Sequence, residues 1–196
     1  MSTAIPPTLM TAEELDAMPE DGIDRELIRG ELRIRGVAGE ERTTRRNRFH
    51  AATEATLAKL LGNWIDQQPQ PRGRVFSGEV GCILSRDPDT SVGIDVAYFS
   101  AASLERQSDN TSMIESPPVL AVEILSPSDK LEDVNEKVDE YLAAGVAVVW
   151  VVDPHFHTVT VFQPNVEPQL FNKDQFLTAA PHLPNLSIAV RTIFAG

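Results

Sequence analysis

The chain has 196 residues, of which 42% are hydrophobic and 23% are charged, and its net charge at pH 7 is −12. These values are typical of one globular domain with a buried core, and they exclude a disordered chain. Because an acidic protein is repelled by a phosphate backbone at long range, the charge disfavours a general, tight nucleic-acid binder. The single cysteine, Cys82, excludes an internal disulfide and a zinc site made of several cysteines.

The N-terminal segment has no basic region followed by an apolar stretch, so we expect no signal peptide. The longest apolar run, residues 143–152, is too short to span a bilayer as a helix. We therefore expect a cytoplasmic protein without a membrane segment, with Cys82 as a small buried hydrophobic residue.

The N-terminal third of the chain predicts two helices and a hairpin. Residues 1–22 predict a helical extension, with a capping box formed by Thr11 and Glu14. Residues 23–28 and 31–36 predict two short strands around a turn at Arg29-Gly30. A helix is predicted over residues 45–64, since apolar or small residues recur there at helical spacing, with Leu57 and Leu61 widening the stripe formed by Phe49, Ala52, Thr56, Leu60 and Trp64.

The central part of the chain predicts most of a sheet. Residues 74–84 and 93–100 favour strands, the first interrupted near Gly78 and Gly81. Residues 119–125 are almost continuously apolar, which indicates a strand buried on both faces.

A helix over residues 129–144 should follow, with a second capping box at Asp129 and Glu132 and a C-terminal glycine, Gly145. Residues 147–153 then predict a strand parallel to 119–125, and residues 158–163 pair back as a hairpin. The remaining residues predict short extended pieces.

Arginine is concentrated near the start of the chain. Residues 29–48 contain seven arginines and three acids. A solvated loop explains this pattern as well as phosphate contact does. The candidates for nucleic-acid contact are Arg42, Arg45, Arg46 and Arg48.

Three charged residues stand where apolar residues are expected. Glu123 lies within the apolar strand 119–125, where an ionised carboxylate needs a cation or hydrogen-bond donors. Asp95 lies in a strand, which disfavours aspartate. Lys137 shares a helical stripe with Val134 and Tyr141, so its side chain should point towards the sheet. The structural alternatives are a buried ion pair for Glu123, a strand-end cap for Asp95 and a solvent-reaching side chain for Lys137.

Together, two strand carboxylates and an inward lysine predict a site for Mg²⁺ or Mn²⁺, because such hard cations prefer oxygen ligands. A bound ion of this kind polarises a phosphodiester and lowers the pKa of a bound water. The lysine would orient that water and offset charge in the transition state.

The sequence resembles the Uma-type family of putative restriction endonucleases, a domain of unknown function abundant in cyanobacteria. That family belongs to the PD-(D/E)XK nuclease superfamily. The resemblance is strongest over VEILSPS (122–128), the following Lys137, Tyr141 and Gly145-Val146, and WVVDP (150–154). It extends to RELIRGELRIRG (25–36), GIDVAYFS (93–100) and LPNLSIAV (183–190).

The resemblance implies a single restriction-endonuclease-like domain over residues 1–196, of the α/β class, with a mixed central β-sheet flanked by helices. It implies that Asp95 and Glu123 bind Mg²⁺, with Mn²⁺ as a substitute. The usual superfamily lysine, two positions after the acid, is replaced by Leu125, and Lys137 matches it from the following helix. The proline of the family motif is Ile94 here, and Glu31 and His50 match family positions as supporting residues.

The implied function is Mg²⁺-dependent hydrolysis of DNA phosphodiester bonds by an endonuclease, acting as a homodimer as many such nucleases do. One alternative is a catalytically inactive interaction module with the nuclease fold. The acidic charge favours it, whereas the retention of Asp95, Glu123 and Lys137 argues against it. Another alternative is a metal-dependent hydrolase of a different phosphoester.

Overall fold

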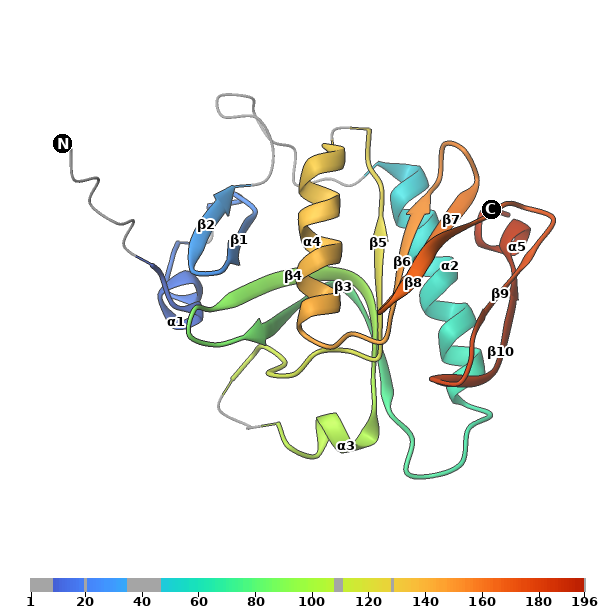
Figure 1. Ribbon diagram of the computed structural model, residues 1–196, viewed down its shortest axis with the longest axis horizontal. Helices are drawn as coiled ribbons and strands as arrows, with labels where there is room; N and C mark the ends of the chain where they lie inside the picture. The colour runs from blue at the N-terminus through green and yellow to red at the C-terminus, as the bar shows by residue number, and fades with distance from the viewer. Residues whose placement is uncertain (1–8, 20, 35–46, 108–110, 128, 196) are drawn as a thin grey trace.

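The computed structural model describes residues 9–19, 21–34, 47–107, 111–127 and 129–195. Within these residues, eight strands form one sheet in the order β2-β1-β4-β5-β6-β7-β8, with β3 paired to β4 beside this path (Figure 1). The strands are β1 (Arg25–Ile28), β2 (Glu31–Ile34), β3 (Arg74–Ser85), β4 (Thr90–Phe99), β5 (Leu120–Ile124), β6 (Val148–Asp153), β7 (Thr158–Gln163) and β8 (Val166–Phe171).

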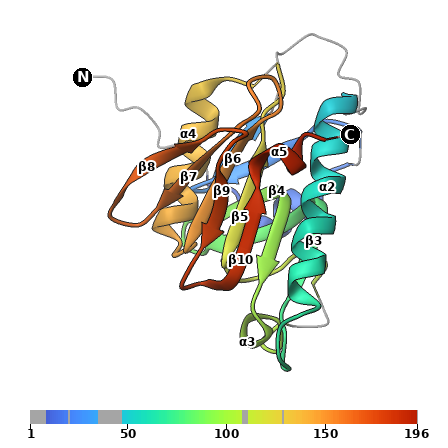
Figure 2. The ribbon, with the colours of Figure 1, turned by 90° about the vertical axis from the view of Figure 1, so that its right-hand side faces the viewer.

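Helices and a second small sheet cover the two faces of this main sheet. The helices are α1 (Ala12–Asp16), α2 (Arg48–Ile65), α3 (Ala101–Leu104), α4 (Leu131–Ala143) and α5 (Val190–Ile193), and the small sheet pairs β9 (Phe176–Ala179) with β10 (Leu183–Ala189). Figure 2 shows α4 on one side of the main sheet and α2, β9 and β10 on the other. In the described part of the chain, no helix is both long and apolar enough to cross a bilayer.

The core is split into two layers by the main sheet. Even-numbered residues of β5, such as Val122, pack with α2, β9 and β10, whereas odd-numbered residues, such as Ala121, pack with α4. All five residues of β5 are buried, as predicted for a central strand. β5 and β6 are parallel and joined by α4, and β7 returns antiparallel to β6. Cys82 is also fully buried, and burial raises the pKa of its thiol to about 12.

Two predictions about the helices are wrong in detail. The inward face of α2 carries His50, Thr53, Leu57, Leu61 and Trp64, whereas Phe49 is 58% exposed. The predicted stripe is right at Leu57, Leu61 and Trp64 but wrong at Phe49, because the inward face begins with the polar residues His50 and Thr53.

The second capping box does not form, since α4 begins after Lys130, which makes no side-chain capping bond. Asp129 instead accepts a hydrogen bond from the backbone N–H of Ser126. Gly145, with φ +94°, ends the helix as predicted.

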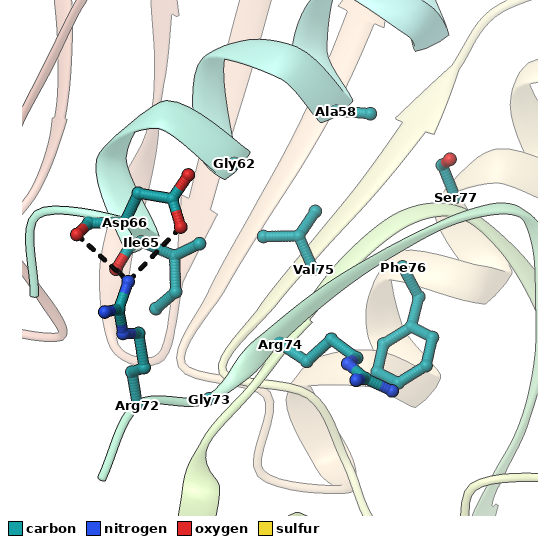
Figure 3. Close-up of a pocket in the computed structure, with 10 residues that line it drawn as sticks. All are labelled: Ala58, Gly62, Ile65, Asp66, Arg72, Gly73, Arg74, Val75, Phe76 and Ser77. Carbon is teal, nitrogen blue, oxygen red and sulfur yellow. Dashed lines mark hydrogen bonds and ion pairs between the residues drawn. The ribbon is translucent and has the colours of Figure 1, made fainter. Parts of the chain in front are cut away.

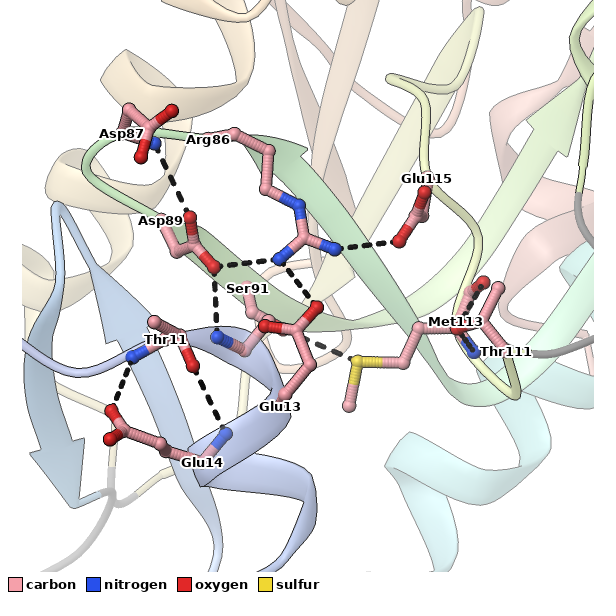
Figure 4. Close-up of polar contacts among 11 residues, drawn as sticks. Thr11, Glu13, Glu14, Arg86, Asp87, Asp89, Ser91, Thr111, Met113 and Glu115 are labelled. Atoms are coloured by element: carbon pink, nitrogen blue, oxygen red, sulfur yellow. Dashed lines mark hydrogen bonds and ion pairs between the residues drawn. The ribbon is translucent and has the colours of Figure 1, made fainter.

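A charged network attaches α1 to the turn between β3 and β4 (Figure 4). The Arg86 guanidinium contacts Glu13 at 2.8 Å, Asp89 at 2.8 Å and Glu115 at 2.6 Å. The buried Asp89 also accepts the backbone N–H of Ala12 at 2.8 Å. Burial is the largest single influence and opposes ionisation of Asp89, but these hydrogen bonds outweigh it and lower its pKa.

Asp89→Asn is expected to reduce the acid sensitivity of folding. A carboxylate with a lowered pKa stabilises the fold above its ordinary pKa of 3.8, and this contribution is lost as the pH falls through the folded value. The variant should therefore be less stable than wild type by about 1 kcal/mol at neutral pH. The difference should shrink by about pH 3, measured by urea unfolding. A constant difference across this range would contradict the assignment.

Candidate active site

Asp95 and Glu123 lie on neighbouring antiparallel strands. Val96 of β4 pairs with Val122 of β5, and continuing this register by one residue sets Asp95 opposite Glu123. The backbone N–H of Ile124 donates to Asp95 Oδ2 at 2.7 Å. Asp95 is only 6% exposed and Glu123 only 7%. The sheet therefore buries two acids at the point where β4 and β5 cease to pair.

Lys137 brings an ammonium group to this point from α4. Its side chain is 4% exposed, so the inward orientation is confirmed and the solvent-reaching alternative is wrong. Nζ lies 2.8 Å from Glu123 Oε1, 2.8 Å from the carbonyl oxygen of Gly93 and 3.2 Å from Glu26 Oε1. The Gly93 carbonyl accepts a hydrogen bond from the ammonium, and the two carboxylates pair with its charge.

Tyr141 lies one helical turn after Lys137 and contacts the same carboxylate. Its hydroxyl donates to Glu123 Oε1 at 2.5 Å, and the side chain is fully buried. A short hydrogen bond from a hydroxyl to an ionised oxygen is among the stronger polar contacts in proteins. Two residues of one helical stripe thus contact the same oxygen of Glu123.

Glu26 is the site residue that the sequence interpretation missed. It lies on β1, is 4% exposed, and accepts the backbone N–H of Gly93 at 3.0 Å in addition to its contact with Lys137. The available signal was an acid directly before Leu27 and Ile28, the same kind of misplaced charge that singled out Glu123.

Glu31, the acid that the family resemblance suggested, does not reach this cluster. Its side chain is 46% exposed and pairs with Arg33 at 2.8 Å. Glu31 is the first residue of β2, an edge strand of the main sheet, so it remains near solvent. The acid of this hairpin that contacts the Lys137 ammonium is Glu26, which belongs to the inner strand.

His50 contacts Asp95 from α2. The imidazole is 1% exposed, and its Nε2 lies 3.3 Å from Asp95 Oδ2. Burial is the largest influence on Asp95 and would raise its pKa, but the contacts with His50, the Ile124 N–H and the nearby Lys137 together lower it. Asp95 is therefore ionised at neutral pH, as a cation ligand must be.

The arginines that were candidates for phosphate contact are only partly described. Arg42, Arg45 and Arg46 lie outside the described residues. Arg48, at the start of α2, is exposed and places its guanidinium 4.6 Å from the centre of the Phe49 ring. Contact between these arginines and a nucleic acid stays a prediction.

The carboxylates of Asp95 and Glu123 fit a Mg²⁺ ion that keeps several of its water ligands. Among the residues that the structure describes, no three histidine, cysteine, aspartate or glutamate side chains form a metal-binding group. Mg²⁺ needs no such cage, because it commonly binds through one or two carboxylates and keeps several waters. The described contacts of Asp95 all involve Oδ2, so Oδ1 is the oxygen available for a cation.

Two surface hollows lie apart from this cluster. One, of about 330 Å³, lies between α2 and the start of β3 and is lined in part by Arg72 and Arg74 (Figure 3). The other, of about 490 Å³, shares these arginines and extends towards Met113. Neither hollow is lined by Asp95, Glu123 or Lys137. The candidate active site is therefore identified by its buried charged residues and not by a surface hollow.

Comparison with known proteins assigns the chain to a family. The family model Uma2, described as "Putative restriction endonuclease", matches residues 12–191. The chain belongs to the Uma2 family. The Uma2 chain has no match among curated proteins.

Among solved structures, the Uma2 chain resembles a crystal structure described as "a putative nuclease belonging to DUF820" from Anabaena variabilis ATCC 29413. The TM-score is 0.77 at 22% identity, covering 94% of this chain and 97% of the other. The likeness confirms the restriction-endonuclease-like α/β fold. Family and fold together support a nuclease.

Proposed function

We propose that this protein is a Mg²⁺-dependent endonuclease that hydrolyses DNA phosphodiester bonds. The observation that carries the proposal is the burial of Asp95 and Glu123 on adjacent strands, with the buried ammonium of Lys137 2.8 Å from Glu123. Such a concentration of buried, ionised groups stabilises a fold poorly but is common where chemistry takes place. Membership of the Uma2 family supports the same class of reaction.

The metal would be held by Asp95 and Glu123. When bound, Mg²⁺ supplies a Lewis acid that polarises the phosphodiester and lowers the pKa of a coordinated water. Glu123 is oriented by Tyr141 and Lys137, and Asp95 by the backbone N–H of Ile124. These contacts would orient both carboxylates before a cation arrives.

Lys137 would compensate charge and position the attacking water. In the structure its ammonium is surrounded by oxygens of Glu26, Glu123 and Gly93. To hold a water it must exchange one of these partners, and the longest contact, 3.2 Å to Glu26, is the one that exchanges most easily. The ammonium would then offset negative charge that develops on the phosphoryl group.

Binding of the DNA backbone is proposed for the basic segment that precedes α2 and includes its first residue. Arg42, Arg45, Arg46 and Arg48 are the candidates, and their local charge would offset the repulsion expected from a net charge of −12. A homodimer and a cytoplasmic location belong to the same proposal.

An inactive interaction module with the same fold is the second candidate. Two observations favour it: the acidic net charge and the contacts of the Lys137 ammonium with three protein oxygens. In that case the charged cluster would only stabilise the fold, and no cation would be needed.

The test is cleavage of supercoiled plasmid and linear DNA with Mg²⁺, Mn²⁺ or a chelator, by wild type and by Glu123→Gln. We expect metal-dependent cleavage by wild type and none above background by Glu123→Gln, because the amide removes an anionic ligand. Glu132→Gln, an exposed position on α4, is the matched control and should cleave like wild type.

The outcomes separate the candidates. Cleavage that survives Glu123→Gln would remove Glu123 from the mechanism. Absence of cleavage with every metal and DNA tested would favour the interaction module. Turnover of small phosphoesters without cleavage of DNA would assign another phosphoester hydrolase.

A further inference from the structure

His50 is unusual because it is almost fully buried and one of its ring nitrogens accepts or donates no hydrogen bond within the described part of the chain. The side chain is 1% exposed, and among the described residues no hydrogen bond reaches Nδ1. Buried polar atoms of this kind are rare and call for an explanation. A residue kept only for packing would cost less as a leucine or phenylalanine.

The second ring nitrogen faces Asp95. Nε2 lies 3.3 Å from Oδ2 of Asp95, the same oxygen that accepts the N–H of Ile124. Because an ionised carboxylate only accepts hydrogen bonds, Nε2 carries a proton in this contact. His50 and Ile124 thus approach one oxygen of Asp95 together and fix the rotation of the carboxylate.

Glu54 lies one turn further along α2, on the other side of the imidazole. Its Oε2 is 3.8 Å from Nδ1, which is too long for a hydrogen bond, and its side chain is 18% exposed. The imidazole therefore lies between two carboxylates, with the close contact on the Asp95 side. This resembles the carboxylate–histidine pairs that orient ligands around metal ions, with the carboxylate as the ligand here.

We infer that His50 is a positioning residue for Asp95: its Nε2–H holds Oδ2, so that Oδ1 is presented to the cation. The inference rests on the proposed function, since it specifies how one of the two proposed ligands is oriented. His50 itself would not touch the metal or the DNA. Its loss should weaken metal binding and slow cleavage, without changing the apparent KM for DNA.

Two amide substitutions distinguish positioning from packing. The amide nitrogen of glutamine reaches about as far from the backbone as Nε2, whereas that of asparagine reaches only about as far as Nδ1. Mn²⁺ binding to the protein without DNA, measured by electron paramagnetic resonance, is the main readout. Urea unfolding checks that both variants fold, and His182→Gln, an exposed histidine, is the matched control.

We expect His50→Asn to weaken Mn²⁺ binding by about 10- to 100-fold, as is usual when a group that orients a ligand is lost. His50→Gln should stay close to wild type. Equal weakening by the two variants, or no weakening by either, would overturn the inference and leave the proposed function standing. A wild-type protein that does not bind Mn²⁺ would overturn both.

Discussion

Lys137→Met should lower the free energy of unfolding by about 3 to 5 kcal/mol and reduce DNA cleavage to background. The ammonium contacts Glu26 and Glu123, which are both buried. Removing one partner of a buried ion pair leaves charge in a low-dielectric environment, which is costlier than replacing the whole cluster. Urea unfolding without divalent ions measures this loss.

Repeating the unfolding of Lys137→Met with Mg²⁺ tests whether the buried carboxylates hold a cation. A cation held by Asp95 and Glu123 binds the folded state only, so millimolar Mg²⁺ should restore part of the stability that Lys137→Met loses. Lys59→Met, at an exposed position on α2, should change stability by less than about 0.5 kcal/mol. If Lys137→Met lowers the free energy of unfolding by less than about 1 kcal/mol, the carboxylates of Glu26 and Glu123 are solvated and do not depend on the ammonium.

Tyr141→Phe should lower the free energy of unfolding by about 2 kcal/mol and slow cleavage about tenfold. The substitution removes one hydroxyl that donates to Glu123 at 2.5 Å and keeps the buried ring, so no large cavity forms. Hydrogen bonds to ionised acceptors contribute about 1.5 to 3 kcal/mol, more than neutral ones. Single-turnover cleavage and urea unfolding measure the two effects.

Tyr98→Phe is the control for this experiment. Tyr98 lies on β4 and packs with the core layer of α2, on the opposite face from Tyr141. Its loss of a hydroxyl should leave cleavage unchanged. If Tyr141→Phe cleaves as fast as wild type although its stability falls, the hydroxyl contributes to folding and not to the orientation of Glu123.

The sequence was sufficient to predict the burial of Glu123 and Lys137 because the signal there is local. Glu123 interrupts a run of apolar strand residues, and Lys137 shares the periodicity of Val134 and Tyr141. Burial follows from such patterns, since strands and helices expose alternate faces at known periods. The structure accordingly buries all three residues of this site: Asp95, Glu123 and Lys137.

The supporting residues were harder to predict. Glu26 and Glu31 belong to the same short hairpin, and the sequence offered no means to decide which of its two strands would be the inner one. The rotation of α2, which turns His50 inwards and Phe49 outwards, was also misjudged, because polar residues occupy part of its buried face.

The sequence by itself determined the order of the elements, the burial of β5 and the presence of charge inside the fold, because each depends on neighbours along the chain. Only the tertiary structure decided which oxygens surround the Lys137 ammonium: Glu26 from β1, Gly93 from β4 and Glu123 from β5. Those contacts depend on strand order and register between segments remote in sequence, which local periodicity does not encode.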